Sequence, residues 1–387
     1  MDSLPEGHST GRLECSHEMY IDRLIAKNFR NYRFLDMQLS PEANFIVGGN
    51  GAGKTNILEV ISVLSGIRSF RNTPDSEIIL WGESSYYCHA TAGDCRSADF
   101  EVACSLIDGA LRKKVKIDGT GIKKIGDYYG KLLSVFMSPW DIHLIGGAPQ
   151  LRRRFIDAVI SSTDREYLDQ LGDFKRILSS RNRLLKRLHA ERSSPRAELD
   201  AWDGMFAQSA VEICRKRRDF MERFSRDFEH AYEMIASDDA PPQLRYNSSL
   251  EPDEEESVLS VLRSARERDI IFGSSGMGPQ RDDLRFLGGG GRQFRDFASQ
   301  GQMRTASIAL KIAESNYIEK ATGERVIILI DDIFSELDQA RRRKLLDQLI
   351  RGNQVIFTMV NADMVVHAGF RDVKNFFVEG KGIVREQ

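Results

Sequence analysis

This sequence of 387 residues has no apolar run close to the roughly 18 to 20 residues that a membrane-spanning helix requires. Its longest clear apolar segment covers only residues 326–330. The first 18 residues are polar and lack the apolar centre of a secretory signal, so we expect residues 1–18 to form a disordered extension. These absences predict a soluble chain with no membrane partner.

Cysteine is also scarce, and no charge of either sign dominates. The five cysteines form no C-x-x-C pair, which disfavours a disulfide framework and suits a reducing cytoplasm. Cys88, His89, Cys95 and Cys104 lie close enough for a zinc site to be considered, but their spacing fits no usual ligand pattern and favours buried thiols. Because 55 basic and 57 acidic residues nearly cancel, any nucleic-acid-binding surface must be a local basic patch.

Glycine is distributed unevenly, and this divides the chain. Between about residues 151 and 236 glycine is nearly absent and helix formers are frequent, which predicts long helices. On either side, apolar strands alternate with glycine-rich turns and helices, which is typical of an α/β domain. We therefore predict an α/β core in two parts, residues 19–150 and 258–387, interrupted by a mostly helical lobe over residues 151–257.

A glycine-rich loop follows the apolar strand Phe45-Ile46-Val47. The segment Gly48-Gly49-Asn50-Gly51-Ala52-Gly53-Lys54-Thr55 matches the phosphate-loop pattern G-x-x-x-x-G-K-[ST] at every position, and Asn56 follows directly. Such glycines let successive N–H groups point at phosphates, while Lys54 places a positive charge on them and the Thr55 hydroxyl can bind Mg²⁺. A plain turn with a surface lysine is the alternative, but a strand before and a helix after favour residues 48–56 as a nucleotide site.

A second apolar strand, residues 327–330, ends in Asp331 and Asp332. Ligands of α/β proteins bind at the carboxyl ends of strands, so we expect both acids at the same edge as the loop. Asp331 would hold Mg²⁺ together with Thr55, and Asp332 would orient the attacking water, acting with Lys54 as the catalytic pair. Solvated acids that merely cap a buried strand are the alternative.

Further segments carry recognisable motifs. Phe297-Ala298-Ser299-Gln300-Gly301-Gln302-Met303-Arg304 leads into a predicted helix and resembles the ABC signature, while Ser335-Glu336-Leu337-Asp338 looks like a D-loop. Gly278-Pro279-Gln280-Arg281-Asp282-Asp283-Leu284 is similar to the motif G-P-H-R-D-D-L. Shorter matches are Asn28-Phe29-Arg30-Asn31-Tyr32, Ser69-Phe70-Arg71, Met137-Ser138-Pro139-Trp140-Asp141 and Arg152-Arg153-Arg154. Together they resemble the RecF family, from residue 19 nearly to the end of the chain.

This resemblance implies an ABC-type P-loop ATPase head with an inserted helical lobe. Ser299, Gly301 and Gln302 would face the γ-phosphate held by the phosphate loop of a second subunit, which implies an ATP-dependent homodimer. It further implies DNA repair, replication and recombination at single-strand gaps or double-strand/single-strand junctions, with RecO- and RecR-type proteins as partners. The local alternative is that Ser299 only caps a helix.

The sequence departs from the wider ABC pattern at several positions. Asp332 stands where most ABC ATPases have glutamate, and residues 358–361 contain no switch histidine. The turn at residues 138–141 lacks the usual glutamine, and Gln280 replaces the motif histidine. A shorter acid and a missing histidine predict slow, switch-like hydrolysis, and the family resemblance implies a weak ATPase that DNA stimulates.

Basic residues concentrate in the expected helical lobe. They include Lys175, Arg176, Arg181, Arg183, Lys186, Arg187 and Arg192, followed by the cluster Arg215-Lys216-Arg217-Arg218. A leucine stripe through the first helix should leave the cations on its solvent side. Many such faces are only solvated, but here we expect salt-sensitive contacts to DNA phosphates, from Arg183, Lys186 and Arg187 or alternatively from Arg152 and Arg153.

Two other functions fit a phosphate loop. A small-molecule kinase would need an acceptor site and a lid, and would not need residues 299–302. The nucleotide-binding subunit of an ABC transporter would keep the glutamine and the switch histidine that this chain lacks. An SMC-type protein would need coiled-coil heptads far longer than residues 151–236.

Overall fold

The computed structural model describes residues 19–71, 73–93, 97–191, 196–236, 240–250, 254–349, 352–361, 369–379 and 383–386. Residues 1–18, for which we predicted a disordered extension, lie outside the described residues, and so does Cys95. Within these ranges, none of the helices combines the length and the apolar character needed to cross a bilayer.

A mixed sheet of six described strands organises the α/β part. Its order is β14 (Ile383–Glu386), β13 (Val373–Glu379), β3 (Ala43–Val47), β12 (Val355–Met359), β11 (Ile327–Asp331) and β8 (Ser134–Met137). The pairs from β13 to β8 are parallel, whereas β14 is antiparallel to β13. β3 and β12 are buried along their whole length, which explains why they appear in the sequence as continuous apolar runs.

Side chains alternate between the two faces of this sheet, and each face packs on a different helix. Ile46, Leu329 and Ile356 join the hydrophobic cluster that contains helix α1 (Lys54–Gly66). Phe45, Ile330 and Phe357 join the cluster that contains helix α8 (Gln300–Thr322). Helices α1 and α8 therefore lie on opposite faces of the central sheet.

An antiparallel sheet covers the other side of α1. Its order is β2 (Tyr32–Gln38), β1 (Tyr20–Phe29), β4 (Ser85–Gly93), β5 (Ala98–Ile107), β6 (Ala110–Ile117) and β7 (Thr120–Gly121). Cys88 and Cys104 lie on the core face of β4 and β5, and burial raises the pKa of both thiols. No group of three potential metal ligands occurs among the described residues. The sequence favours buried thiols over a zinc site, and Cys88 and Cys104 are buried as that interpretation predicts.

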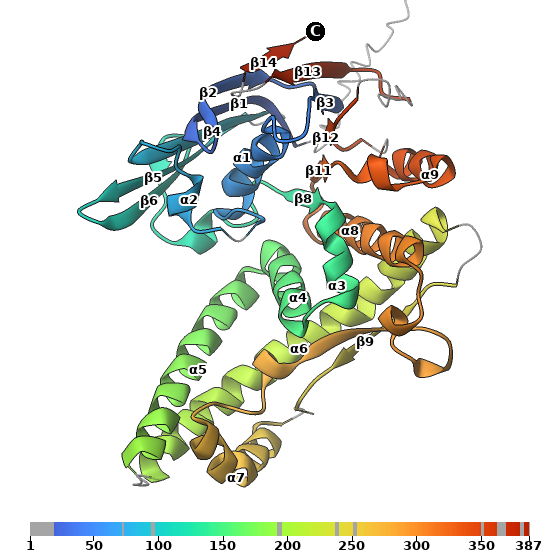
Figure 1. Cartoon of the computed structure of the whole chain (residues 1–387). Helices are drawn as coiled ribbons and strands as arrows, with labels where there is room; N and C mark the ends of the chain where they lie inside the picture. The colour runs from blue at the N-terminus through green and yellow to red at the C-terminus, as the bar shows by residue number, and fades with distance from the viewer. Residues whose placement is uncertain are drawn as a thin grey trace, which may run out of the picture.

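The helical lobe extends away from the two sheets (Figure 1). It contains α3 (Ile142–Gly146), α4 (Pro149–Thr163), α5 (Arg165–Glu191), α6 (Arg196–Ile235) and α7 (Glu255–Phe272), with the strand pair β9 (Gln243–Asn247) and β10 (Asp283–Leu287). Helix α7 packs on α5 and α6, because Val258 and Leu262 on its apolar face need cover. The boundary expected after residue 257 thus falls inside this lobe, and the chain returns to the central sheet through β10 and α8.

Buried ion pairs connect α6 to α4 and to the segment before β10 within the lobe. Asp282 is completely buried; it accepts hydrogen bonds from Arg217 Nη1 (3.2 Å), the Tyr246 hydroxyl and the backbone N–H of Ser249 (2.8 Å). Arg217 also pairs with Asp157 at 2.8 Å. The aspartates of the segment at residues 278–284 are therefore structural.

This network contradicts one of the predicted DNA contacts, Arg152, whereas Arg153 is half-buried and stays a prediction. The Arg152 side chain is only 5% exposed and pairs with Asp283 at 2.8 Å, and Arg153 Nη1 donates to the backbone oxygen of Asp282 at 2.6 Å. The expectation that the cations of the first long helix all face solvent was also wrong, because Arg181 is fully buried between Asp203 and Asp269. The sequence shows that these residues are positively charged, but it does not show whether they are buried in ion pairs or exposed to solvent.

Removing the acid of the buried Asp282–Arg217 pair should lower the free energy of unfolding far more than removing the acid of a surface pair. We expect Asp282→Ala to lower the free energy of unfolding by about 3 kcal/mol or more, because it removes the buried carboxylate that Arg217 and Tyr246 share. The matched control is Glu212→Ala, which removes the acid that pairs with the exposed Arg215 on α6 and should cost less than about 1 kcal/mol. Urea unfolding followed by circular dichroism measures both, and equal losses would contradict a structural role for Asp282.

Candidate nucleotide-binding site

The phosphate loop connects β3 to α1, and the turn between β1 and β2 supports it. Gly53 has a φ of 112°, and a Cβ at this position would clash with the side-chain amide of Asn31. Asn31 Nδ2 donates to the carbonyl of Ala52 at 3.2 Å, and the Tyr32 hydroxyl donates to that of Gly53 at 3.1 Å. The segment at residues 28–32, which the sequence marks only as a motif, thus braces the loop.

Lys54 places its ammonium group at the loop itself. Its Nζ donates to the carbonyl oxygens of Gly48 at 2.7 Å and Gly49 at 3.0 Å. Burial lowers the pKa of Lys54, and the carboxylates of Asp332 and Asp331 oppose this shift. A partly desolvated cation on a ring of glycines can attract a phosphate group strongly.

Asp331 lies at the carboxyl end of β11, where it meets the loop. Its Oδ1 accepts hydrogen bonds from the hydroxyls of Thr55 (2.8 Å) and Thr358 (2.7 Å). Hydroxyl and carboxylate oxygens are hard donors of the kind that Mg²⁺ prefers, so the chemistry of Thr55 and Asp331 fits the predicted metal. The structure brings together these two residues from distant parts of the sequence, as predicted.

Asp332 occupies a strained turn directly after β11. Its φ of 49° is left-handed, and its backbone N–H donates to Thr358 Oγ1 at 3.1 Å. Burial raises the pKa of Asp332, while Ser335 and Lys54 oppose the shift. Thr358 therefore contacts both acids, a role that sequence reasoning missed, because it noted only the absence of histidine at residues 358–361.

Arg71 is a second residue whose place the sequence did not reveal. Asn56 Nδ2 donates to Asn31 Oδ1 at 2.7 Å, and Asn56 Oδ1 accepts from Arg71 Nη1 at 3.2 Å. Arg71 also pairs with the buried Glu59 at 3.4 Å. An exposed guanidinium thus lies beside the phosphate loop, and the motif match at residues 69–71 was its only sequence signal.

The signature segment begins α8. Ser299 Oγ accepts a hydrogen bond from the N–H of Gln302 at 3.1 Å, and the Ser299 N–H donates to Gln302 Oε1 at 2.8 Å, which completes a capping box. The D-loop segment lies alongside, because Arg304 pairs with Glu336 at 2.9 Å. Ser299, Gly301 and Gln302 thus share one surface with residues 335–338, on a helix that packs on the face of the sheet opposite α1.

The turn at residues 138–141 contacts α8 rather than supplying a glutamine. Asp141 Oδ2 accepts from the Ser138 N–H at 2.6 Å in a capping box. Burial raises the pKa of Asp141 to about 6, although Lys311 of α8 opposes the shift. The end of β8 is therefore coupled electrostatically to the signature helix.

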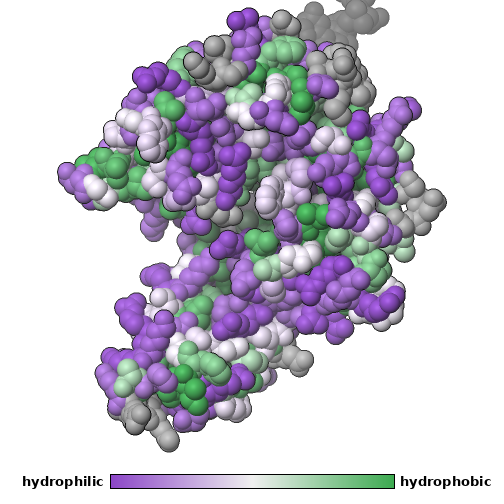
Figure 2. All heavy atoms as spheres, in the orientation of Figure 1, coloured by the Kyte–Doolittle hydropathy of each residue, from purple (hydrophilic) through white to green (hydrophobic). Residues whose placement is uncertain are grey.

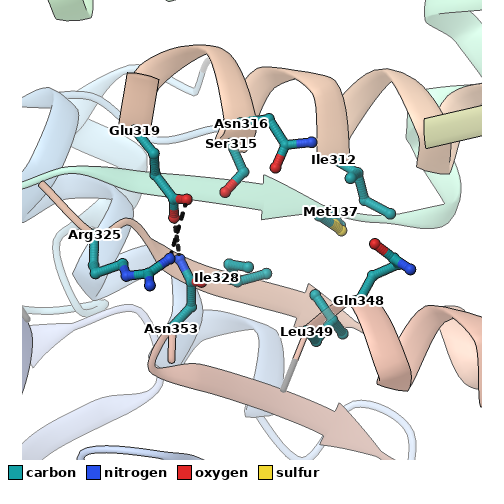
Figure 3. Close-up of a pocket in the computed structure, with 10 residues that line it drawn as sticks. All are labelled: Met137, Ile312, Ser315, Asn316, Glu319, Arg325, Ile328, Gln348, Leu349 and Asn353. Carbon is teal, nitrogen blue, oxygen red and sulfur yellow. Dashed lines mark hydrogen bonds and ion pairs between the residues drawn. The ribbon is translucent and has the colours of Figure 1, made fainter. Parts of the chain in front are cut away.

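A separate pocket of about 160 Å³ lies between α8, the sheet and helix α9 (Gln339–Leu349) (Figure 3). Inside it, Glu319 points toward Arg325 and accepts a hydrogen bond from Asn353 (Figure 3). None of the predicted site residues lines this pocket. Because neither the phosphate loop nor the acids at the end of β11 reach this pocket, we do not assign it to the nucleotide.

Of the predicted DNA contacts, Arg183, Lys186 and Arg187 are exposed on α5. Among the residues that the structure describes, an ion pair joins only Arg187 of these three to an acid, Glu198. The structure therefore leaves Arg183 and Lys186 on a solvent-facing surface, distant in sequence from the phosphate loop.

Known proteins resemble this chain over nearly its whole length. The family described as RecF/RecN/SMC N terminal domain matches residues 20–383. The DNA replication and repair protein RecF of Heliobacterium modesticaldum is 37% identical over 346 residues, which is 88% of this chain and 91% of that protein. RecF of Leptospira interrogans is 33% identical over 369 residues, which is 95% of this chain and 99% of that protein.

Solved structures agree with these relatives. The structure of the recombination mediator protein RecF-ATP in the RecFOR pathway has a TM-score of 0.87 at 29% identity, covering 97% of this chain and 99% of that chain. The Smc head domain of Pyrococcus furiosus, at 17% identity and a TM-score of 0.53, covers 95% of this chain and 96% of that chain and shares the fold alone. These matches confirm the predicted α/β fold of an ABC-type ATPase head, and they favour neither a transporter subunit nor a small-molecule kinase. The chain belongs to the RecF family of DNA replication and repair proteins.

Proposed function

We propose that this chain is an ATP-dependent, DNA-binding recombination-repair factor that dimerises around ATP on DNA and hydrolyses ATP slowly. The protein would bind DNA at a single-strand gap or at a double-strand/single-strand junction. There it would help to load a recombinase, together with RecO- and RecR-type proteins. The similar RecF-ATP structure, of a recombination mediator in the RecFOR pathway, supports this proposal. A cytoplasmic location follows from this role.

The phosphate loop and the signature segment lie apart in one chain, and this separation supports an ATP site shared between two subunits. The phosphate loop begins α1, whereas the signature begins α8 on the opposite face of the central sheet. Ser299 and the backbone N–H groups in the first turn of α8 form a positive helix end that suits an anion. A second subunit would bring its signature to the γ-phosphate on Lys54, so ATP would become part of the interface and dimerisation would depend on it.

The residues at the strand ends suit slow hydrolysis. When bound at Thr55 and Asp331, Mg²⁺ would neutralise charge on the phosphates. Asp332 would orient and polarise the attacking water, and its raised pKa makes it a better proton acceptor than an exposed aspartate. Thr358 fixes the backbone of Asp332 but cannot act as the missing switch histidine, which fits a switch-like enzyme rather than a fast one.

Lys54 and Asp332 should separate ATP binding from ATP hydrolysis. Lys54→Ala removes the cation from the loop and should weaken ATP binding by at least about tenfold, because a charge-assisted contact to phosphate is lost. Asp332→Asn keeps the shape and should bind ATP normally but hydrolyse it at least about a hundredfold more slowly. Titration with a fluorescent ATP analogue and single-turnover hydrolysis distinguish the two. Asp347→Asn, on the exposed side of α9, is the control, and normal turnover by Asp332→Asn would refute its assigned role.

A mixing experiment tests the shared site. A Lys54→Ala subunit keeps its signature without a working loop, and a Ser299→Arg subunit keeps its loop with a blocked signature. Each should be inactive alone. Random reassortment makes about half of the dimers mixed, each with one intact site of two, so about a quarter of wild-type ATPase activity should return.

Sedimentation of the mixture with ATP provides the control for association. If the two folded variants associate and no activity returns, the shared site is wrong. Activity from the Ser299→Arg protein alone would show that the site is complete within one chain.

A further inference from the structure

A shallow hollow of about 490 Å³ runs along the exposed face of α5. Its lining consists of Lys175, Leu178, Ser179, Asn182, Arg183 and Lys186. Residues three and four apart share one face of a helix, so these side chains form a continuous strip. From Lys175 to Lys186 the strip is about 16 Å long, at 1.5 Å per residue. Three of its six residues are basic and none is acidic or aromatic.

Contacts divide the cations of α5 into two groups. Arg176 pairs with Asp173, Arg187 pairs with Glu198, and Arg181 is buried between two aspartates. In contrast, no ion pair joins Lys175, Arg183 or Lys186 to an acid in the described ranges of the chain. The uncompensated positive charge of this helix therefore lies in the hollow.

The side chains of the hollow are held by neighbouring elements. A Cβ on Gly273, at the end of α7, would lie 2.9 Å from Lys186 Cγ, so the aliphatic part of Lys186 packs on that turn. Asn182 Oδ1 accepts hydrogen bonds from Ser275 N (2.8 Å) and Ser275 Oγ (2.7 Å). Lys186 and Asn182 are therefore held in place by α7 and the segment that follows it, which keeps this part of the strip ordered.

Two further cations extend the strip toward the sheets. Arg154 is exposed on α4, and Arg68 is exposed just after α1. Burial lowers the pKa of Lys175; Asp157 opposes the shift, and both arginines add to it through like-charge repulsion. Cations from three elements therefore act on one another, an arrangement that an anionic ligand would stabilise. Figure 2 shows the surface indented between the helical lobe and the part that contains the antiparallel sheet.

We propose that the α5 hollow is the track that holds the sugar-phosphate backbone of double-stranded DNA. The inference deepens the proposed function and rests on its DNA-binding part. Lysine and arginine without acidic partners contact phosphates and release counterions. The length of about 16 Å matches about five base pairs of duplex at 3.4 Å each. Binding single strands usually needs aromatic side chains on which bases stack, and the lining contains none.

The proposal changes the set of residues expected to bind DNA. Arg183 and Lys186 remain from the sequence prediction, whereas Arg187 is compensated by Glu198. Arg152 is buried in an ion pair with Asp283, and Arg153 lies outside the hollow. Lys175, which the sequence included in the cluster but not among the main candidates, becomes a central contact.

The test compares two triple variants of the full chain that remove equal charge. The track variant is Lys175→Gln/Arg183→Gln/Lys186→Gln. The matched control, Arg176→Gln/Arg187→Gln/Arg215→Gln, removes three helical arginines that have acidic partners. Fluorescence anisotropy with ATP and Mg²⁺ measures binding to a labelled blunt duplex, and to a single strand of the same length, over a range of salt concentrations.

We expect the track variant to bind duplex at least about tenfold more weakly, with a slope of log K against log salt smaller by about 3, because three phosphate contacts are lost. The control should change affinity by no more than about twofold, since its charges are already compensated. A charge-conserving variant, Lys175→Arg/Arg183→Lys/Lys186→Arg, should keep the wild-type slope, which separates lost charge from lost folding.

The possible failures are distinguishable. If the wild-type protein binds neither DNA, the DNA-binding part of the proposed function is wrong. If it binds DNA and both glutamine variants weaken equally, or if the charge-conserving variant also loses the slope, the α5 track is overturned. Loss of single-strand binding with unchanged duplex binding would overturn the assignment to double-stranded DNA.

Discussion

The parallel pairing of β3, β12 and β11 is the constraint on which the rest of the site depends. Strand β12 lies between the other two, with Thr358 opposite Asp331 on one side and Met359 opposite Val47 on the other. This register ends all three strands at one edge, so Thr55 and Asp331 come within 2.8 Å although 276 positions separate them. A shift of one residue would turn Thr358 to the other face and break its bonds to both acids.

The same sheet also explains why one chain would hold only part of an ATP site. Both of its faces are apolar, and each must be covered by a helix. Helix α1, which follows the phosphate loop, covers one face, and helix α8, which carries the signature, covers the other. Burial therefore places the N-terminal ends of these two helices on different layers, and symmetry between two subunits is a simple way to bring them together.

Charge has two separate uses in the helical lobe. Buried arginines such as Arg181 and Arg217 have aspartate partners and connect helices that are distant in sequence. No ion pair within the described part of the chain joins the surface cations of the α5 hollow to an acid. The first group gives the lobe its shape, because an unpaired buried charge would be very costly. The second remains available to an external anion, which is why the two groups must be separated before a binding surface is assigned.

The amino-acid sequence alone predicts the features that depend on a few consecutive residues. The phosphate loop, the acids after an apolar strand and the cap at Ser299 all follow from local spacing, and so does the division into an α/β core and a helical lobe. The structure alone decided what depends on partners from elsewhere: that Thr358 joins both acids, that Arg71 lies beside the loop, that α7 belongs to the lobe, and that Arg152 is buried while Lys175 is not. The physical reason is that burial and ion pairing depend on contacts between residues that are distant in sequence. Local sequence patterns do not show which of these residues come into contact.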